Sequence, residues 1–190
     1  WHDPAIAGKA IVLPWPLGLD AETITSKGAI QTLSFIGSIY QYNFYRAFWL
    51  AQAQERGIPI SFTRKTHDRD DGLPAMESYR RCIRALKRER YPLNFSMRRD
   101  GSRVYTSRGL EAIAVGCCLV QERNMDLHEL YSPGRHYLEF DTIDDLHDIA
   151  RFIEKNPEKA DKIAREGQRF ALEHYSDAKI VEKLERILWS

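Results

Sequence analysis

Apolar residues along the chain fall into two patterns that alternate from one stretch to the next. Short continuous apolar runs are typical of buried strands, and apolar residues that recur at i, i+3 and i+4 are typical of amphipathic helices. The short runs predict strands at residues 32–36, 58–62, 91–95, 117–120 and 137–140. Because helical stretches separate these runs, the pattern predicts an α/β domain with a doubly wound parallel sheet and helices on both faces.

The helical stretches are bounded by residues that start or stop helices. Gly57 and Gly116 follow two of them, as glycine does at helix ends, and Pro157 begins another at a position where its missing N–H costs little. The expected helices span residues 43–55, 74–89, 107–115, 126–131, 143–155, 157–174 and 178–188. With residues 10–13 as an additional strand, the sheet would contain roughly six strands.

Residues 107–140 form the segment around which the rest of the chain is organised. It is predicted to form a helix, a strand, a short helix and a second strand, with a Ser-Pro-Gly turn at residues 132–134. One polar residue, Glu111, interrupts the apolar side near the start of the first helix. A carboxylate there is favoured by the helix dipole and faces the mouth of the sheet, where open α/β sheets bind ligands.

This segment resembles the donor-binding half of the group 1 glycosyltransferases with the GT-B fold. The stretches GLEAIAVGCCLV and LHELYSPGRHYLEF carry the resemblance, and IEKNPEKADKIAREGQRFALEHYS is similar to the closing helices of that class. Tyr79-Arg80, Leu93-Asn94-Phe95-Ser96 and Arg108 to Ala112 are similar to elements of the spore-coat maturation type. The resemblance therefore extends from about Thr32 to the end of the chain.

The resemblance implies a Rossmann-like domain that is one half of a GT-B enzyme. Residues 1–30 would be the interdomain segment and residues 31–190 the donor-binding domain, with the N-terminal acceptor domain outside this chain. The implied activity is transfer of a hexose-type sugar from a nucleotide diphosphate donor to a glycan, lipid or protein acceptor, as in polysaccharide biosynthesis. Because the acceptor site of such enzymes lies mostly on the other domain, we expect little transferase activity from these residues alone. No metal ion or other cofactor is expected.

A nucleotide-sugar donor sets three chemical requirements for its site. Its diphosphate needs backbone N–H groups and cations, its ribose diol needs a carboxylate that accepts two hydrogen bonds, and its base needs a flat apolar slot. Glu111 is the predicted ribose ligand. The other predicted donor-binding residues lie at strand ends, in basic loops or at the start of a helix: Gly37, Ser38, Lys65, Ser96, Ser107 and Arg108.

The predicted catalytic residues follow from a departure from the family pattern. Retaining group 1 enzymes place a second Glu eight residues before the ribose-binding Glu, and this chain has Arg103 there. An Arg at that position can pair with the diphosphate and assist the leaving group as a cation. Glu122, Asp126 and Glu129 come just after the next strand, and we expect one of them to reach the sugar hydroxyls. Arg103 and Glu122 are the predicted catalytic residues, and the stereochemical outcome stays open.

The net charge of the chain is +1, but it is unevenly distributed. Residues 64–108 hold 13 Lys and Arg against 6 Asp and Glu, a net charge of +7, which leaves −6 for the rest of the chain. A basic region of this kind suits an anionic ligand. Most of the cations on its helix are interpreted as a solvated face: Arg80, Arg81, Arg84, Lys87, Arg88 and Arg90. Nucleic acid is not an expected partner, because the overall charge is near neutral and no aromatic and basic binding motif stands out.

Several other classes of function are excluded by missing motifs. The chain has no HExxH, paired-cysteine or G-x-S-x-G motif, which argues against a metal site built by the protein alone and against protease or esterase chemistry. Phe35-Ile36-Gly37 ends the first strand without the Asp that a response-regulator domain requires. The remaining alternative to an enzyme is a nucleotide-binding regulatory or interaction module without catalytic activity.

The expected location is the cytoplasm, with peripheral attachment to the inner membrane left open. No apolar run approaches the roughly 20 residues that span a bilayer, and the start of the chain has no signal-peptide pattern. Because the chain also begins without Met, we expect it to be a fragment of a longer protein. The chain has three cysteines, an odd number that does not suggest a set of paired disulfides. Cys82, Cys117 and Cys118 are interpreted as reduced thiols.

Overall fold

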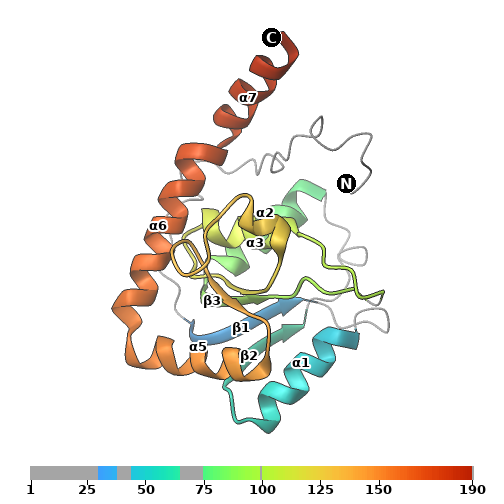
Figure 1. Ribbon diagram of the computed structural model, residues 1–190, viewed down its shortest axis with the longest axis vertical. Helices are drawn as coiled ribbons and strands as arrows, with labels where there is room; N and C mark the ends of the chain where they lie inside the picture. Colours follow the sequence, from blue (N-terminus) through green and yellow to red (C-terminus); the bar gives the residue numbers. More distant parts are fainter. Residues whose placement is uncertain (1–29, 38–43, 65–74, 99, 190) are drawn as a thin grey trace.

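The computed structural model describes residues 30–37, 44–64, 75–98 and 100–189 (Figure 1). Within these residues the strands form one five-stranded sheet in the order β2-β1-β3-β4-β5, in which every neighbouring pair is parallel. The strands are β1 (Ile30–Gly37), β2 (Ile60–Arg64), β3 (Glu89–Asn94), β4 (Val120–Glu122) and β5 (Leu138–Phe140). The predicted doubly wound α/β fold is confirmed. Residues 10–13, expected as an additional strand, lie outside the described residues.

Helices cover both faces of the sheet, as the sequence predicts (Figure 1). One face carries α1 (Phe44–Glu55) and α5 (Ile143–Lys155), and the other carries α2 (Ala75–Leu86) and α3 (Ser107–Ala114). The other helices are α4 (Met125–His128), α6 (Pro157–Tyr175) and α7 (Asp177–Trp189), and α7 extends away from the body of the molecule. None of the helices in the described part of the chain is both long and apolar enough to cross a bilayer.

Several boundaries differ from the prediction: the second strand is Ile60–Arg64 where 58–62 was expected, the third is Glu89–Asn94 where 91–95 was expected, and the short helix expected at 126–131 is Met125–His128. At two further boundaries the sheet overrides the local pattern. The helix expected to reach residue 89 ends at Leu86, since Glu89 already belongs to β3. The strand expected at residues 117–120 is hydrogen-bonded as a strand at Val120–Glu122 instead. Its apolar run ends at Val120, but the parallel ladder with β5 continues through the two polar residues that follow. Two polar side chains therefore stand at the C-terminal end of a buried strand.

Alternate strand residues face two separate layers of the core. Phe35, Leu93 and Val120 point to the face covered by α1 and α5. There the Trp49 ring of α1 meets Phe140 of β5 edge-on, with ring centroids 5.2 Å apart. Burial of such aromatic and branched side chains is the main favourable contribution to folding. The core on this face therefore fixes α1 and α5 against the sheet.

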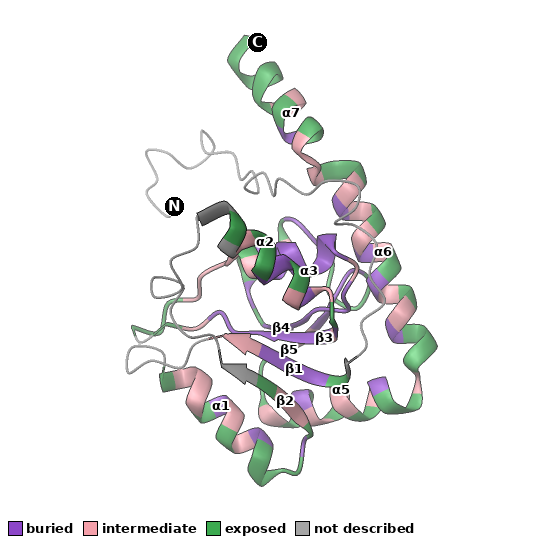
Figure 2. Ribbon diagram, turned by 180° about the vertical axis from the view of Figure 1, so that it is seen from behind, coloured by how far each residue is buried: buried purple, intermediate pink, exposed green. Residues whose placement is uncertain are grey.

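The opposite layer is built around α3. Leu110 and Ile113 of this helix pack with Leu119, which precedes β4, and with Leu127 of α4. Figure 2 shows that buried residues concentrate in the sheet and in α3, while the other helices have exposed outer sides. Because α3 is buried along most of its length, its position relative to the sheet is set by packing.

Small residues on α6 allow this helix to pack closely against α3 and against the segment that leads into β5. Ala160 and Ala164 pack in the core layer on the face covered by α1 and α5, and Ala171 packs in the layer around α3. At Gly167 the approach is closest, because a Cβ atom there would lie 2.3 Å from the backbone carbonyl oxygen of His136. No side chain fits at that distance, so Gly167 sets the separation between α6 and the segment that leads into β5.

Candidate functional site

The order in which successive strands are added to the sheet changes side between β1 and β3. The chain passes from β1 to β2 on one side, and then returns to place β3 on the other side of β1. The carboxyl ends of the strands at such a switch point form the crevice in which open α/β sheets bind ligands. Gly37 ends β1 at this point, and a Cβ atom there would lie 2.6 Å from the ring of Phe35. The predicted ligands Ser38 and Lys65 lie outside the described residues.

Glu122 is a buried carboxylate at the end of β4, with 0% of its surface exposed. Its Oε2 accepts hydrogen bonds from the backbone N–H groups of Ser96 at 2.7 Å and Met97 at 3.0 Å. Its Oε1 is also buried and has no hydrogen-bond partner among the described residues. Because a buried polar atom without a partner costs free energy, Oε1 is an acceptor suited to a ligand hydroxyl.

Buried amide side chains fix the ends of β3 and β4 relative to each other. Asn94 Nδ2 donates to Gln121 Oε1 at 2.7 Å, and Gln121 Nε2 donates to Ser96 Oγ at 2.7 Å. Asn124 Nδ2 donates to the same Ser96 oxygen at 3.3 Å. The helix α3 crosses this network at Gly109, where a Cβ atom would lie 3.2 Å from Gln121 Oε1. Ser96 thus lies at the expected edge of the sheet, with its hydroxyl already engaged by protein groups.

The helix α3 carries Arg108 and Glu111 to the same edge. Arg108 Nε lies 3.4 Å from Glu111 Oε2, and the Glu111 side chain is only 8% exposed. Glu111 is the fifth residue of α3, beyond the first turn in which the helix dipole acts strongly. Its charge is therefore stabilised by Arg108 more than by the dipole. Ser107 begins α3 and is exposed.

Part of the Arg108 guanidinium is buried without a partner. Its Nε and Nη1 atoms have no hydrogen-bond acceptor among the described residues. A guanidinium is always charged and presents its donors in a planar fork that matches phosphate and carboxylate groups. Arg108 therefore offers both a positive charge and unused donors at the mouth of the sheet.

Arg46 of α1 is a further cation at this edge, and the sequence analysis did not single it out. Its guanidinium carbon lies 6.0 Å from the centroid of the Phe35 ring, close to the end of β1. Burial lowers the pKa of Arg46, repulsion from Arg108 lowers it further, and attraction to Glu122 raises it. Arg46 is thus within electrostatic range of both residues. An isolated cation among the aromatic residues of NFYRAFW was the available signal.

Arg103 lies at the outer side of the site and is engaged by protein groups. Its Nη1 donates to the backbone carbonyl of Arg123 at 2.6 Å, and its Nη2 donates to Asp141 Oδ1 at 2.6 Å. These bonds tie the loop after β3 to the ends of β4 and β5. Asp126 and Glu129, the other acidic residues named above, are exposed at α4.

The structure therefore brings five charged or polar residues to the strand ends around the switch point: Arg46, Ser96, Arg108, Glu111 and Glu122. Arg103 borders this group through its bonds to β4 and β5. Within the described residues, no three His, Cys, Asp or Glu side chains are arranged to hold a metal ion.

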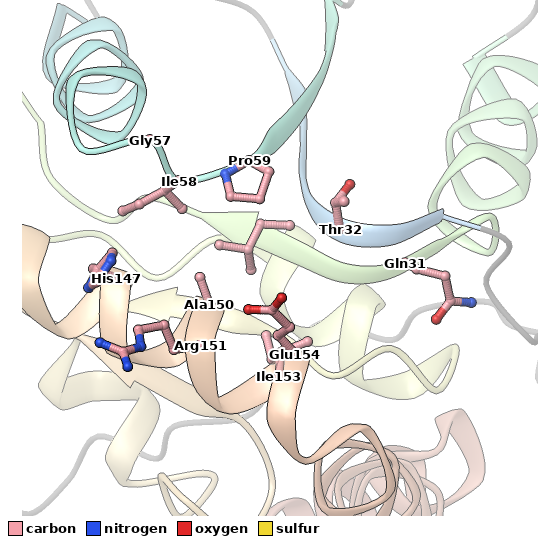
Figure 3. A pocket seen from close by; sticks show the side chains of 11 residues that line it. Gln31, Thr32, Gly57, Ile58, Pro59, His147, Ala150, Arg151, Ile153 and Glu154 are labelled. Carbon is pink, nitrogen blue, oxygen red and sulfur yellow. The ribbon is translucent and has the colours of Figure 1, made fainter.

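A cavity of about 460 Å³ lies at the opposite end of the sheet (Figure 3). It opens between the start of β1, the turn at residues 57–59 and α5, with Arg151 and Glu154 among its lining residues. Open α/β sheets bind their ligands at the carboxyl ends of the strands. The cavity is at the amino ends of β1 and β2, and it is not part of the candidate site.

A doubly wound parallel sheet with helices on both faces defines a Rossmann-like domain, and its charged groups gather at the switch point, where open α/β sheets bind ligands. A family model described as glycosyl transferase-like matches residues 46–186. The match covers most of the chain, and the chain belongs to this family. No curated protein sequence matches the chain.

Several solved structures share the fold of this chain. HepE (Alr3699) of Anabaena, solved in complex with UDP, superposes with a TM-score of 0.60 at 15% identity, over 83% of this chain and 40% of that one. TarM of S. aureus superposes with a TM-score of 0.59 at 12% identity, over 88% and 37%. Sucrose-phosphate synthase of Thermosynechococcus elongatus gives 0.55 at 14% identity, over 83% and 38%. The likeness shows the GT-B type of Rossmann-like fold, and this chain spans about 40% of the length of HepE.

Proposed function

We propose that this chain binds a nucleotide diphosphate sugar and forms the donor half of a glycosyltransferase. The observation that carries the proposal is the grouping of Arg46, Arg108 and Glu122 at the switch point, with buried and unpartnered atoms on Arg108 and Glu122. Diphosphates are bound by cations and by N–H donors, and sugar hydroxyls by carboxylate acceptors. Membership of the family supports this ligand, as do the structures of HepE with UDP and with UDP-glucose.

Each site residue has a role that its position favours. Arg108 donates to the diphosphate through Nη1, which has no hydrogen-bond acceptor among the described residues, while its Nε faces Glu111. Arg46 adds a second positive charge beside it. Glu111, one turn further along α3, accepts hydrogen bonds from the ribose hydroxyls. Glu122 Oε1 accepts a hydrogen bond from the transferred sugar, while Oε2 keeps the loop after β3 in place. Ser96 holds Glu122 in place through its backbone N–H, which donates a hydrogen bond to Oε2.

The contacts of Arg103 favour a positioning role over direct contact with the leaving group. Both of its terminal nitrogens donate to protein oxygens, so its charge is shared with Asp141. In this role Arg103 holds the loop that leads into α3, and thereby orients Arg108. The positive charge that stabilises the departing diphosphate comes in this proposal from Arg46 and Arg108, with no metal ion required.

The proposal includes finer features that the resemblance implies. The donor carries a hexose-type sugar on a nucleotide diphosphate, the acceptor is a glycan, lipid or protein bound by a second domain, and the reaction takes place in the cytoplasm as part of polysaccharide biosynthesis. The HepE structures with UDP and UDP-glucose favour uridine as the base. The protein is of the spore-coat maturation type. Because this chain spans about 40% of HepE, we propose that it binds donor without appreciable transfer when tested by itself.

Calorimetric titration of UDP into the chain tests the proposal. We expect Arg46→Ala and Arg108→Ala to weaken UDP binding by roughly 10- to 100-fold, because hydrogen bonds to charged groups contribute roughly 1.5–3 kcal/mol. Uridine, which lacks the diphosphate, should bind these variants as it binds the parent. Arg165→Ala, at an exposed position on α6, is the matched control. Equal UDP affinity of the parent and both site variants would contradict the proposal.

A further inference from the structure

The helix α1 is apolar on two sides, and its outer side is exposed. The inner side carries Trp49 and Ala53, which are buried in the core. The outer side carries four uncharged residues at the spacing i, i+3, i+4 and i+7, here called the outer stripe: Phe44, Ala47, Phe48 and Ala51. The two phenylalanines of this stripe are 46% and 56% exposed. A helix on the surface of a protein normally has a polar outer side, and a helix that is apolar all round is normally buried.

A groove beside α1 extends the outer stripe to the edge of the sheet (Figure 1). The strand β2 forms that edge, and the groove is lined by Ala47 and Ala51 from α1 and by Ile60 and Phe62 from β2. None of the described residues that line it carries a charge. The ring of Phe62 stacks on Phe35 with centroids 5.7 Å apart and is still 43% exposed. The outer stripe and the groove therefore form one uncharged surface, here called the apolar face.

The order of large and small residues in the outer stripe is self-complementary. Consider two copies of α1 that pack antiparallel about a twofold axis between residues 47 and 48. Phe44 of one copy then faces Ala51 of the second copy, and each contact occurs twice, as twofold symmetry requires. Phe48 likewise faces Ala47 of the second copy. Each phenyl ring meets a small residue, which is the arrangement by which side chains interdigitate in well-packed cores.

The helix α7 also exposes apolar residues, but its exposed side lacks this alternation. Val181, Leu184 and Leu188 are all large and exposed. An antiparallel pair of α7 helices would therefore place large side chains opposite each other, with no small residue to receive them. The outer stripe of α1 is thus better suited than α7 to bind a copy of itself.

We propose that the apolar face of α1 binds a second copy of this chain, with the two α1 helices antiparallel across a twofold axis. A specific interface buries roughly 800 Å² on each partner. The exposed rings of Phe44, Phe48 and Phe62 supply roughly 300 Å² of that area, and the rest of the apolar face contributes the remainder. We therefore expect a weak dimer with a dissociation constant in the micromolar range. The proposal is independent of the donor site, which lies at the strand ends.

Sedimentation equilibrium over about a hundredfold range of protein concentration tests the proposal. We expect the mean mass to rise from that of one chain toward that of two, and to do so equally at low salt and at about 1 M salt, because salt does not screen an apolar interface. Phe44→Ala should raise the dissociation constant at least about 10-fold, since each dimer loses two rings. Leu188→Ala removes an apolar side chain that is 72% exposed on α7, and this matched control should dimerise like the parent.

An exchange of two facing residues tests the twofold geometry. Ala51→Phe places a ring opposite Phe44 and should weaken the dimer, whereas F44A/A51F again pairs one large residue with one small residue. We expect this double variant to regain most of the affinity that either single variant loses. Both positions are exposed, and circular dichroism verifies that each variant keeps its fold.

Three outcomes would overturn the proposal. The first is a chain that stays monomeric at every concentration. The second is a dimer that Leu188→Ala weakens as much as Phe44→Ala does, which would assign the association to α7. The third is a double variant F44A/A51F that dimerises no better than the single variants, which would contradict the antiparallel contact between residues 44 and 51.

Discussion

The backbone N–H of Ser96 donates a 2.7 Å hydrogen bond to Oε2 of Glu122, which joins the C-terminal ends of β3 and β4. The bond uses only one oxygen of a fully buried carboxylate and leaves Oε1 without a partner among the described residues. A purely structural carboxylate normally has both oxygens satisfied. One oxygen of Glu122, Oε2, therefore holds the loop after β3, and the other, Oε1, is available to a ligand.

Glu122→Gln separates the structural role of this carboxylate from its role in binding the ligand. The amide oxygen of Gln can still accept from Ser96, so the loop after β3 is retained, but the charge and the second acceptor are lost. We expect the affinity for UDP-glucose to fall roughly 10-fold, while the affinity for UDP changes little. Calorimetric titration with both ligands measures the difference. A parallel loss for the two ligands would show that Glu122 acts only by holding the loop.

Glu111→Gln tests the ribose ligand. The substitution keeps the shape of the side chain but replaces one charge-assisted acceptor with an NH2 donor. We expect UDP and uridine to lose affinity by the same factor, roughly 10- to 100-fold, because both contain the ribose. Melting temperatures provide the control, since the exchange also weakens the 3.4 Å pair with Arg108. Unchanged nucleotide affinity together with a much lower melting temperature would assign Glu111 to the structure alone.

A double-mutant cycle on Arg103 and Asp141 tests the positioning role of Arg103. Their side chains are joined by a 2.6 Å hydrogen bond and are 31% and 41% exposed, and such partly exposed pairs contribute about 0.2–1 kcal/mol. We expect Arg103→Ala and Asp141→Ala to weaken UDP binding to a similar, small extent, and the double variant to lose no more than either. If Arg103→Ala alone abolishes UDP binding, the arginine contacts the diphosphate directly.

Gly167→Ala tests the close approach of α6 to the segment before β5. The added Cβ would lie 2.3 Å from the His136 carbonyl oxygen, and backbone atoms cannot move aside as a flexible side chain can. We expect the free energy of unfolding to fall by about 1–3 kcal/mol through overpacking, although alanine favours helix more than glycine does. Urea denaturation measures the change, with Arg165→Ala in the same helix as the reference. A stabilised Gly167→Ala variant would show that α6 can shift freely.

The lowered pKa of His136 predicts that the free energy of unfolding decreases as the pH falls below neutral. Burial lowers the pKa of His136, and the nearby Arg135 lowers it further. Its Nδ1 accepts a hydrogen bond from the backbone N–H of Ser132 at 3.1 Å, and protonation at Nδ1 would abolish this bond. The unfolded chain, with a histidine pKa of about 6.5, therefore takes up the proton first as the pH falls.

The expected result is a free energy of unfolding that decreases below about pH 6.5, by at most about 1.4 kcal/mol per pH unit from this one group. Urea denaturation between neutral and mildly acidic pH measures the slope. His136→Gln should flatten it even though the variant is less stable, because the ring also stacks on Phe170 with centroids 4.3 Å apart. His147→Gln, on the surface of α5, is the control. An unchanged slope in His136→Gln would assign the pH dependence to other groups.

The order of the elements follows from the sequence, because it depends on interactions between residues close together in the chain. The helix α5 begins and ends where the pattern predicts, since Thr142 and Asp145 form a capping box that local geometry alone determines. Pro157 begins α6 for an equally local reason. Alternation of such helices with short apolar runs was sufficient to predict a doubly wound sheet. The placement of Glu111 near the mouth of the sheet followed from the same reasoning.

Tertiary structure alone decided which charged residues meet at the strand ends. Arg46 is far in sequence from Arg108 and Glu122, and only the packing of α1 beside β1 brings it within range of both. The pairing of Arg103 with Asp141 likewise joins residues 38 positions apart. Such contacts depend on how helices pack on a sheet, which no periodicity of apolar residues encodes. The sequence determined the scaffold through local preferences, and long-range packing determined which side chains the scaffold assembles.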